Sequence, residues 1–533
     1  MAEEIKHLPM VVPLPLPEAQ LVEIVEKSKD WALMHGAAMR SKTNFSEDAL
    51  QFAPFVLIPS AFPRKEFAKA LEIQLILNEL MHKVAHDRRF LTESLKETIK
   101  VDEFTGNLFR IYETVHSEGL TQFGYGSVRF DVGGIVQKAH ADLGALLLLE
   151  AGGVQHDRVG FRLAGAVFRG HPERASLGLL RSDYMVNSAS TDKIKQVEIN
   201  TIASSFAGIG TNITVFHRYI LQELGHSEML KNLPENNALE GLCSGMIEAW
   251  KIYGNPKAVI MFLIEDITYN ICDQRFHEFK IREMCPQVRV IRRTLTDMAD
   301  RASLGPKKQL LIDGCEVAVI YFRAGYEPGH YHSQKEWDAR LLMERSLAIK
   351  SPSIHYHLAG TKKVQQTLAK PGALEQFLSD PVKVEKVKQI FAGLYSLDFD
   401  ELGEQAIQMA IDDPERFVLK PQREGGGNNV YGLEVRDAVK KMKDSEERTA
   451  WILMERIHPP LSTGYMVRPG GSKVPQLVDM VSELGIFGVV IGDAEKITYN
   501  KQVGHMLRTK VATANEGGVA AGLGALDSPY LID

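Results

Sequence analysis

The sequence predicts a mixed protein of the α/β and α+β classes, in which a helical N-terminal region precedes two segments that alternate strands with helices. Residues 64–118 are rich in Leu, Lys and Glu at helical spacing. Residues 255–360 place a helical pattern between buried-strand patterns, the order typical of a parallel α/β domain. From residue 361 to the end, short apolar strands and helices are joined by two glycine-rich loops, which is typical of an α+β segment.

Length and composition limit the possible classes of protein. The chain has 533 residues, 44% hydrophobic and 24% charged, enough for two to four domains. A net charge of −6 argues against a nucleic-acid partner, because nucleic-acid-binding domains are usually basic. The acidic N-terminus lacks an apolar signal segment, and the longest apolar run, Leu143–Leu149, is too short for a bilayer, so we expect no membrane association. The four cysteines lack disulfide or metal spacing, and we expect reduced thiols in a cytoplasmic protein.

Residues 1–122 are predicted to form the helical region. Residues 11–17 alternate proline with apolar residues and predict an extended lead-in. Apolar residues then recur at helical spacing from Leu21 to Trp31, and residues 64–118 predict two or three further helices. We expect this region to serve as scaffold.

Residues 123–176 differ from their surroundings. Ten of the 43 glycines fall in this window, and its hydrophobic periodicity is poor. A flexible insertion is therefore expected rather than a domain. Its three histidines, His140, His156 and His171, lie far apart in sequence and are interpreted as solvated rather than as metal ligands.

The middle of the chain predicts core strands. Residues 177–254 are assigned to the body of the protein, and two short blocks separated by a polar turn lie within them, between Arg181 and Phe206. In the segment 255–360, buried strands are predicted at Ala258–Glu265, near 287–292 and at Cys315–Arg323, with a helix near 270–283.

The C-terminal segment 361–533 predicts a nucleotide clamp, because two glycine loops could close over a ligand. The expected elements are a helix near 363–369, helical segments at 383–411, a strand from Phe417 into a glycine loop, a helix near 433–443, a strand at Ile452–Ile457, one or two antiparallel strands at Leu477–Val490, and a last glycine loop at Gly517–Gly522.

The loop after Phe417 carries the clearest chemical pattern. Three consecutive glycines let backbone N–H groups approach a polyanion closely. Lys420 supplies a point charge for phosphate, and Glu424 an oxygen ligand for a hard cation. The pattern is not a P-loop, because no Lys-Ser or Lys-Thr follows the last glycine. A plain surface turn is the alternative for the glycine run by itself.

Three further patterns point to the same chemistry. Glu198 and Asn200 lie two apart in a predicted strand, so they face one side and could bind magnesium; an exposed polar pair is the alternative. Arg508 and Lys510 share a face if extended, and suit a carboxylate and a phosphate respectively. Arg323 lies at the end of a buried strand, where α/β proteins place substrate contacts.

Nine ordered blocks make the chain resemble the eukaryotic glutathione synthetases, which are ATP-grasp ligases. The resemblance covers nearly all of the chain except residues 123–176. It implies an ATP-grasp fold with an inserted parallel α/β substrate-binding domain. The blocks are RSDYM (181–185), QVEINTI (196–202), NICDQR (270–275), YFRAGY (321–326), LAGTKKVQQ (358–366), FVLKPQREGGGNNVYG (417–432), ILMERI (452–457), SELGIFG (482–488) and LRTK with GGVAAG (507–522).

The resemblance also implies an activity. Members join γ-glutamylcysteine to glycine with ATP, and the expected cofactor is Mg²⁺, two ions per active site. The implied path is phosphorylation of the cysteinyl carboxylate to an acyl phosphate, followed by attack of the glycine amine. A cytoplasmic homodimer is expected.

Site residues follow from the matching motifs. The implied metal ligands are Glu198, Asn200 and Glu424. The implied ATP contacts are Glu198, Lys362, Lys420, Glu424, Gly425, Gly426, Gly427, Asn428, Asn429, Tyr431, Met454, Glu455, Arg456, Ile457, Glu483, Lys510 and Glu516. The implied peptide and glycine contacts are Arg181, Ile202, Ala203, Ser204, Ser205, Thr268, Tyr269, Asn270, Gln274, Arg323, Tyr326, Arg508, Val519 and Ala520. The expected catalytic side chains are Arg508, Arg323 and Lys420.

The chain departs from the family pattern in three places. Ala203 replaces a serine, which removes one hydroxyl contact to the peptide, and Glu516 replaces an aspartate. The insertion at 123–176 is either a surface excursion or translated non-coding sequence. Two alternative functions therefore stay open: a ligase that uses β-alanine as acceptor, and a catalytically silent ATP-binding protein disturbed by the insertion.

Overall fold

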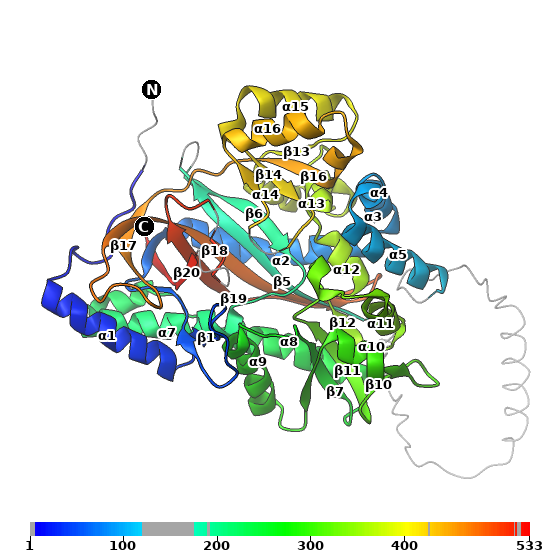
Figure 1. Cartoon of the computed structure of the whole chain (residues 1–533), viewed down its shortest axis with the longest axis horizontal. Coiled ribbons are helices and arrows are strands. Elements are labelled where there is room, and N and C mark those ends of the chain that lie inside the picture. The colour runs from blue at the N-terminus through cyan, green and yellow to red at the C-terminus, as the bar shows by residue number, and fades with distance from the viewer. Residues whose placement is uncertain (1–5, 120–174, 189–191, 425–426, 516, 520–523) are drawn as a thin grey trace, which may run out of the picture.

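The computed structural model describes residues 6–119, 175–188, 192–424, 427–515, 517–519 and 524–533. It is a mixed α/β structure organised around three large sheets (Figure 1). The predicted insertion at 123–176, apart from its last two residues, lies outside the described residues. So do four of the predicted site residues: Gly425, Gly426, Glu516 and Ala520.

A seven-stranded sheet forms the middle of the molecule (Figure 1). Its neighbours pair antiparallel except β20 and β3, which pair parallel. The sheet joins strands from the beginning, middle and end of the chain, so it could not be read from any one segment. Its order is β17 (Ser462–Val467), β3 (Phe55–Val56), β20 (Gly524–Asp527), β19 (Ile497–Val511), β18 (Leu477–Gly492), β5 (Ser176–Asn187) and β6 (Lys193–Asn200).

Alternating side chains of this sheet enter two different cores. On one face, Leu180 and Ile486 pack with the helix α2 (Arg64–Ala85). On the other face, Leu179 and Val489 pack with α7 (Ala207–Glu223) and α8 (Ala238–Tyr253). This two-residue alternation is the expected consequence of strand geometry.

The N-terminal region contains one helix more than predicted between residues 64 and 118. Asp87 and Asp102 each accept a backbone N–H bond as an N-cap, so a new helix begins after each of them although the apolar pattern continues. The lead-in ends at α1 (Glu18–Met34). The other helices are α2, α3 (Arg88–Leu95), α4 (Thr98–Val101) and α5 (Glu103–Ser117).

A six-stranded sheet corresponds to the segment 255–360 and lies below and to the right of the first sheet in Figure 1. The strands predicted in this segment pair parallel, and two short strands that were not predicted, β9 (Ser303–Leu304) and β10 (Leu310–Ile312), add antiparallel pairs at one edge. The two-residue turn Asp313–Gly314, with φ of 49° and 72°, joins β10 to the next strand and suits a tight hairpin. The parallel strands are β7 (Val259–Leu263), β8 (Val290–Arg293), β11 (Cys315–Phe322) and β12 (Ile349–Ser351).

A four-stranded antiparallel sheet lies above the first sheet in Figure 1. Its order is β13 (Leu394–Ser396), β16 (Trp451–Glu455), β14 (Phe417–Pro421) and β15 (Val430–Tyr431). The helical segments predicted at 383–411 are α14 (Pro381–Ile390) and α15 (Glu401–Asp412), and the short strand β13 between them was not predicted. Phe417 and Leu419 bury one sheet face against α15 and α16 (Leu433–Met442).

The remaining elements are short or flank the sheets. They are β1 (Ala38–Met39), β2 (Gln51–Phe52), β4 (Ser60–Pro63), β21 (Pro529–Ile532), α9 (Ile271–Met284), α10 (Leu295–Arg301), α11 (Gln334–Arg345), α12 (Ile354–Ala359) and α13 (Lys362–Leu368). All four cysteines are free thiols. Among the described residues, none of the helices has the length and apolar character that crossing a bilayer requires.

Candidate active site

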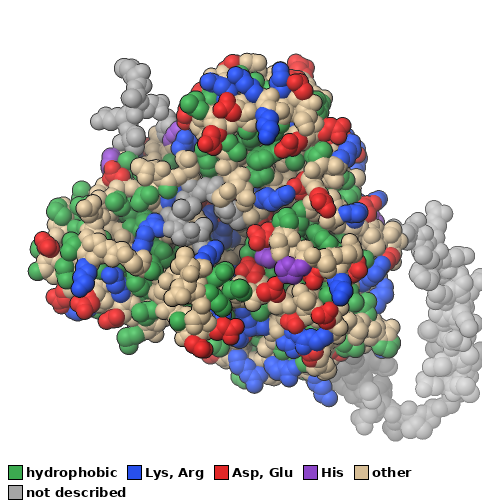
Figure 2. Space-filling view, in the orientation of Figure 1, with side chains coloured by type: hydrophobic (Ala, Val, Ile, Leu, Met, Phe, Trp, Pro, Cys, Tyr) green, Lys and Arg blue, Asp and Glu red, His purple; other side chains and the backbone are tan. Residues whose placement is uncertain are grey.

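One pocket of about 920 Å³ is lined by side chains from the seven-stranded and four-stranded sheets and from loops that follow β7 and β11 of the six-stranded sheet. Figure 2 shows this face of the molecule hollowed near its centre, with Lys or Arg side chains deep in the hollow. The volume is that of a site for one or two small molecules. The predicted site residues that line it are Arg181, Glu198, Asn200, Ile202, Ala203, Ser205, Tyr269, Tyr326, Lys420, Glu424, Asn429, Tyr431, Met454, Glu455, Arg456, Ile457, Glu483, Arg508, Lys510 and Val519.

The floor of the pocket is a row of polar side chains on one face of the seven-stranded sheet. Leu179, Arg181 and Asp183 follow one another at two-residue spacing along β5, so their side chains lie on the same face of the sheet. The helix α8 covers this face at Leu179, and the polar row begins at Arg181. Register pairs place the other members directly opposite: Asn200 opposite Arg181, Glu198 opposite Asp183, and Arg508 opposite Glu483. Four neighbouring strands therefore bring together residues that are up to 327 positions apart in sequence, from Arg181 to Arg508.

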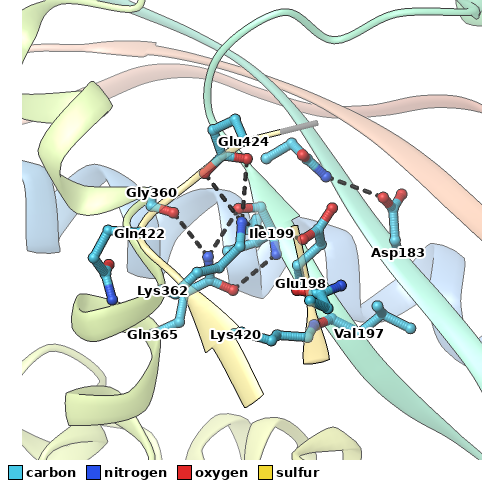
Figure 3. A network of polar contacts seen from close by, with 12 residues as sticks. Asp183, Val197, Glu198, Ile199, Gly360, Lys362, Gln365, Lys420, Gln422 and Glu424 are labelled. Carbon is cyan, nitrogen blue, oxygen red and sulfur yellow. Dashed lines mark hydrogen bonds and ion pairs between the residues drawn. The ribbon is translucent and has the colours of Figure 1, made fainter. Parts of the chain in front are cut away.

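Lys362 joins the two predicted carboxylate ligands (Figure 3). Its Nζ lies 3.1 Å from Oε2 of Glu198, and 3.0 and 3.1 Å from the two carboxylate oxygens of Glu424. Burial by itself lowers the pKa of Lys362, but the two carboxylates raise it above its ordinary value. The lysine is thus a firmly charged ammonium, placed where it holds β6, α13 and the loop after β14 together.

The two carboxylates differ in their ionisation. Burial raises the pKa of Glu198, but Lys362, Lys420 and two arginines bring it well below its ordinary value. Burial holds the pKa of Glu424 above its ordinary value, although Lys362 lowers it. Glu198 is therefore the more firmly ionised of the pair.

Lys420 and Gln365 bind the backbone of the strand β6 at the residues directly before and after Glu198. Lys420 donates to the carbonyl of Val197 at 3.0 Å, and burial lowers its pKa. Gln365 accepts from the N–H of Ile199 at 2.9 Å and donates to its carbonyl at 3.2 Å, as a neighbouring strand would (Figure 3). The free edge of β6 is thus paired by a side chain, and Glu198 is held between the two contacts.

The oxygen donors at this end fit a hard cation. Within the part of the chain that the structure describes, no group of three or more His, Cys, Asp or Glu side chains is placed to hold a metal. Glu198, Glu424 and Asn200 instead offer two carboxylates and one amide oxygen in the same pocket. Magnesium accepts such a small oxygen set when substrate phosphates and water complete its shell.

Arginines mark the other end of the pocket. Arg181 binds Asp183 through Nε at 2.7 Å and Nη2 at 2.8 Å. Arg508 pairs with Glu483 and lies 3.4 Å from Asp183. Burial by itself lowers the pKa of Arg508, but Glu483 and Asp183 raise it above its ordinary value. Both guanidiniums are permanently charged and suited to binding carboxylates.

Several predicted contacts lie just behind the pocket wall. Arg323 donates to Oγ of Ser205 at 2.7 Å, so it supports Ser205, which lines the pocket, from behind. Ser204 donates to the carbonyl of Leu179. Thr268 and Gln274 accept bonds from Arg292 at 3.3 and 3.0 Å, and Asn270 donates to Asp273. Gly427 and Asn428 are exposed.

Sequence reasoning missed three residues that organise the site. Asp183 had a detectable signal, since it lies two residues after Arg181 on the same strand face. Asp273 accepts the N–H groups of Phe206, Gly208 and Ile209 and so caps the start of α7 behind Ser205. Neither Asp273 nor Gln365 has a local pattern that points to the residue it binds.

The pocket thus combines oxygen groups of a type that suits a hard cation (Glu198, Asn200 and Glu424, here named the metal end) with two arginines of a type that suits carboxylates (Arg181 and Arg508, here named the peptide end). The family described as "Eukaryotic glutathione synthase, ATP binding domain" has a model that matches residues 18–132 and 166–531. The chain belongs to this family. The unmatched residues 133–165 fall inside the predicted insertion.

Named relatives agree with the family. The chain is 41% identical to a glutathione synthetase of Xenopus laevis over 96% of its own length and 97% of the relative's. It is 40% identical to a human glutathione synthetase with the same coverage, and 39% identical to a chloroplastic one of Solanum lycopersicum over 90% of this chain and 78% of that one. In fold it is similar to a glutathione synthetase-like effector of Globodera pallida, with a TM-score of 0.71 and 22% identity over 98% of this chain and 100% of that chain.

Proposed function

We propose that this chain is a glutathione synthetase, an ATP-dependent ligase that joins γ-glutamylcysteine to glycine. The observation that carries the proposal is the union, in one pocket, of the Lys362-linked carboxylates with Arg181 and Arg508. Such a pocket can hold a nucleotide and a carboxylate substrate next to each other. Full-length relatives at about 40% identity carry the same name.

The proposed reaction has two steps. The cysteinyl carboxylate attacks the γ-phosphorus of ATP, which forms an acyl phosphate and releases ADP. The glycine amine then attacks the acyl carbon, and the tetrahedral intermediate expels inorganic phosphate. Arg508 lies where it can neutralise charge on the phosphorylated peptide, and Arg323 orients Ser205 behind the peptide.

Positioning and electrostatics are enough for this chemistry. Lys420 lies at the end of β14, where its buried ammonium can bind the ATP phosphates once it leaves the carbonyl of Val197. Glu198, Asn200 and Glu424 would hold Mg²⁺, which supplies charge neutralisation on the phosphates when bound. No protein side chain needs to become a covalent nucleophile.

The finer features of the family complete the proposal. We propose an ATP-grasp fold in which the four-stranded sheet covers the nucleotide, with two Mg²⁺ ions per site. We also propose a cytoplasmic homodimer. Glycine is the proposed acceptor rather than β-alanine, because full-length relatives at about 40% identity carry the name glutathione synthetase.

Phosphate release tests the function. The purified chain is given ATP, Mg²⁺ and γ-glutamylcysteine, with glycine, with β-alanine, or with neither. We expect phosphate release that depends on glycine, with glutathione as the product and a lower rate with β-alanine. A folded protein that binds ATP but releases no phosphate with either acceptor would contradict the proposal.

A further inference from the structure

Asp183 lies at the centre of the polar row on the sheet, where its neighbours Arg181, Glu198 and Asn200 line the pocket and Asp183 itself does not. Its side chain is buried, with 1% of the residue exposed. It belongs to β5, the strand between β6 and β18, so its neighbours on both sides carry site residues. Glu198 lies opposite it on β6, and Gly485 lies opposite it on β18.

The Asp183 carboxylate accepts four N–H bonds from three strands. Oδ1 accepts from Nε of Arg181 at 2.7 Å, and Oδ2 from Nη2 of the same guanidinium at 2.8 Å. Oδ2 also accepts from Nδ2 of Asn200 at 3.0 Å and from Nη2 of Arg508 at 3.4 Å. The Asp183 side chain therefore contacts both arginines of the peptide end and the Asn200 amide of the metal end.

The backbone opposite is shaped to admit this carboxylate. A Cβ atom at Gly485 would lie 2.9 Å from Oδ1 of Asp183 and 3.0 Å from Cδ of Arg181. Both distances are shorter than ordinary van der Waals contacts. Glycine at 485 thus leaves room for the Arg181–Asp183 pair to lie against the sheet.

Charge explains why a carboxylate is needed at this place. Arg181 is buried and Arg508 is half-buried, and two guanidiniums that lie close together repel each other, most strongly where the dielectric constant is low. An anion between them lets both approach the same substrate. The second carboxylate on Arg508, Glu483, lies on β18, and among the described residues it forms an ion pair with Arg508 but none with Arg181.

The amide of Asn200 gives Asp183 a second role. An ionised carboxylate is only an acceptor, so it fixes the Asn200 NH₂ group toward itself and turns the amide oxygen away from it. The NH₂ group also donates to the carbonyl of Arg181 at 3.3 Å. The orientation of a metal-binding oxygen thus depends on the same carboxylate that orients the two arginines.

We propose that Asp183 is a positioning residue that couples the metal end of the site to its peptide end. The inference rests on the proposed glutathione synthetase function. In this role Asp183 touches neither substrate nor metal. It sets Arg181 and Arg508 for the peptide and Asn200 for the cation.

Two variants and one control test the coupling. Asp183→Asn keeps the size of the side chain but removes its charge, and its own NH₂ group could turn the Asn200 amide around. Asp183→Glu keeps the charge and shifts the carboxylate by one methylene. Asp437→Asn makes the same chemical change at an exposed aspartate on α16 and serves as the control.

Binding is measured by calorimetry, so the readout does not require turnover. For Asp183→Asn we expect affinity for γ-glutamylcysteine, and the Mg²⁺-dependent part of ATP affinity, each to fall about 10- to 100-fold. Asp183→Glu should recover part of both, and Asp437→Asn should match the unmodified chain. ATP affinity without Mg²⁺ and the circular dichroism spectrum should stay unchanged in all three.

Two results would overturn the inference. One is unchanged binding of both ligands in Asp183→Asn, and the other is loss of only one of the two. If Asp183→Asn does not fold, Asp183→Glu decides between the same outcomes, because both of its affinities should fall together. An unmodified chain that binds peptide and Mg²⁺–ATP but forms no glutathione would instead contradict the proposed function and leave the coupling intact.

Discussion

The two ends of the pocket are built in different ways. At the metal end, Glu198, Lys362 and Glu424 come from a strand, a helix and a loop that lie in different parts of the chain, and a single ammonium holds them together. At the peptide end, Arg181 and Asp183 lie on one strand, two residues apart, and the sheet register adds Arg508. The first end is assembled by tertiary contacts and the second by strand geometry.

This difference has a functional consequence. The carboxylates of the metal end are engaged with Lys362, so under the proposed function a bound cation would have to take over contacts that the lysine makes. The arginines of the peptide end are already oriented by carboxylates. We therefore expect the metal end to rearrange on binding and the peptide end to bind with little change.

The largest effect should come from the metal end. Glu424→Ala removes one of two carboxylates available to the cation and leaves Lys362 with Glu198 alone. We expect kcat/KM for ATP to fall about 10³-fold, because a bound metal contributes several kcal/mol of charge stabilisation. Steady-state kinetics with Mg²⁺ titration measures this. Glu434→Ala, at an exposed glutamate of α16, is the control, and near-normal activity of Glu424→Ala would remove the metal assignment.

The next effect should separate the two ends. Arg508→Ala deletes a cation of the peptide end and leaves Glu483 without its arginine partner. We expect kcat/KM for γ-glutamylcysteine to fall about 10²-fold, the usual loss when one preorganised charge stabiliser is removed. Peptide and ATP are varied separately in the assay. A fall in ATP affinity alone would show that Arg508 acts on the nucleotide and not on the peptide.

The packing of α2 on the seven-stranded sheet should determine how stability falls at acid pH. Burial lowers the pKa of His82, on α2, and of His505, on β19, to about 3. Both side chains lie where α2 packs against the seven-stranded sheet. Since the unfolded histidines titrate near their ordinary pKa of 6.5, their contribution to stability is present above pH 6.5. It is lost as the pH falls toward 3.

Each of these histidines should steepen the acid loss of unfolding free energy by about 1.4 kcal/mol per pH unit. Asp527 should oppose this loss of stability, because burial raises its pKa to about 6 from the ordinary value of 3.8. Between these two pH values the folded chain binds a proton at Asp527 that the unfolded chain does not, so this group stabilises the fold as the pH falls. Urea denaturation at several pH values measures the slope. His505→Leu should flatten it and His7→Leu, at an exposed position, should not; equal slopes would contradict this account.

The smallest effect concerns the peptide end. Ala203 lines the pocket with a positive φ of 54°, next to Ser205, and Ala203→Ser adds a hydroxyl there. A single neutral hydrogen bond contributes about 1 kcal/mol, so we expect KM for γ-glutamylcysteine to fall by less than about tenfold. Peptide titration at saturating ATP and glycine measures the change. An increase in KM would show that the hydroxyl has no partner in the peptide.

The two ends also differ in how far the sequence predicts them. Two-residue spacing correctly places Glu198 and Asn200 on one face, because strand alternation is local. The contact between Lys362 and Glu198 spans 164 positions and has no local pattern. Gln365 is likewise invisible, since an amide that pairs a strand edge looks like any helical glutamine.

Errors in the fold have the same origin. The strand β13 is three residues long and sits between two helices, so the helical pattern on both sides hides it. The β10–β11 hairpin was missed although Asp313–Gly314 is a strong turn signal, because the parallel pattern of the long strands dominates the segment. The seven-stranded sheet unites β3, β5 and β18 from distant segments, and no local periodicity reports such pairing.

The central claim is that the pocket activates a peptide carboxylate by phosphorylation. The most direct test uses γ-glutamylcysteine labelled with ¹⁸O in its cysteinyl carboxylate, together with ATP, Mg²⁺ and glycine. Mass spectrometry should find one ¹⁸O atom in the inorganic phosphate for each glutathione formed, because the carboxylate oxygen leaves with the phosphoryl group. Glutathione accompanied by unlabelled phosphate, or ATP hydrolysis without glutathione, would contradict the account.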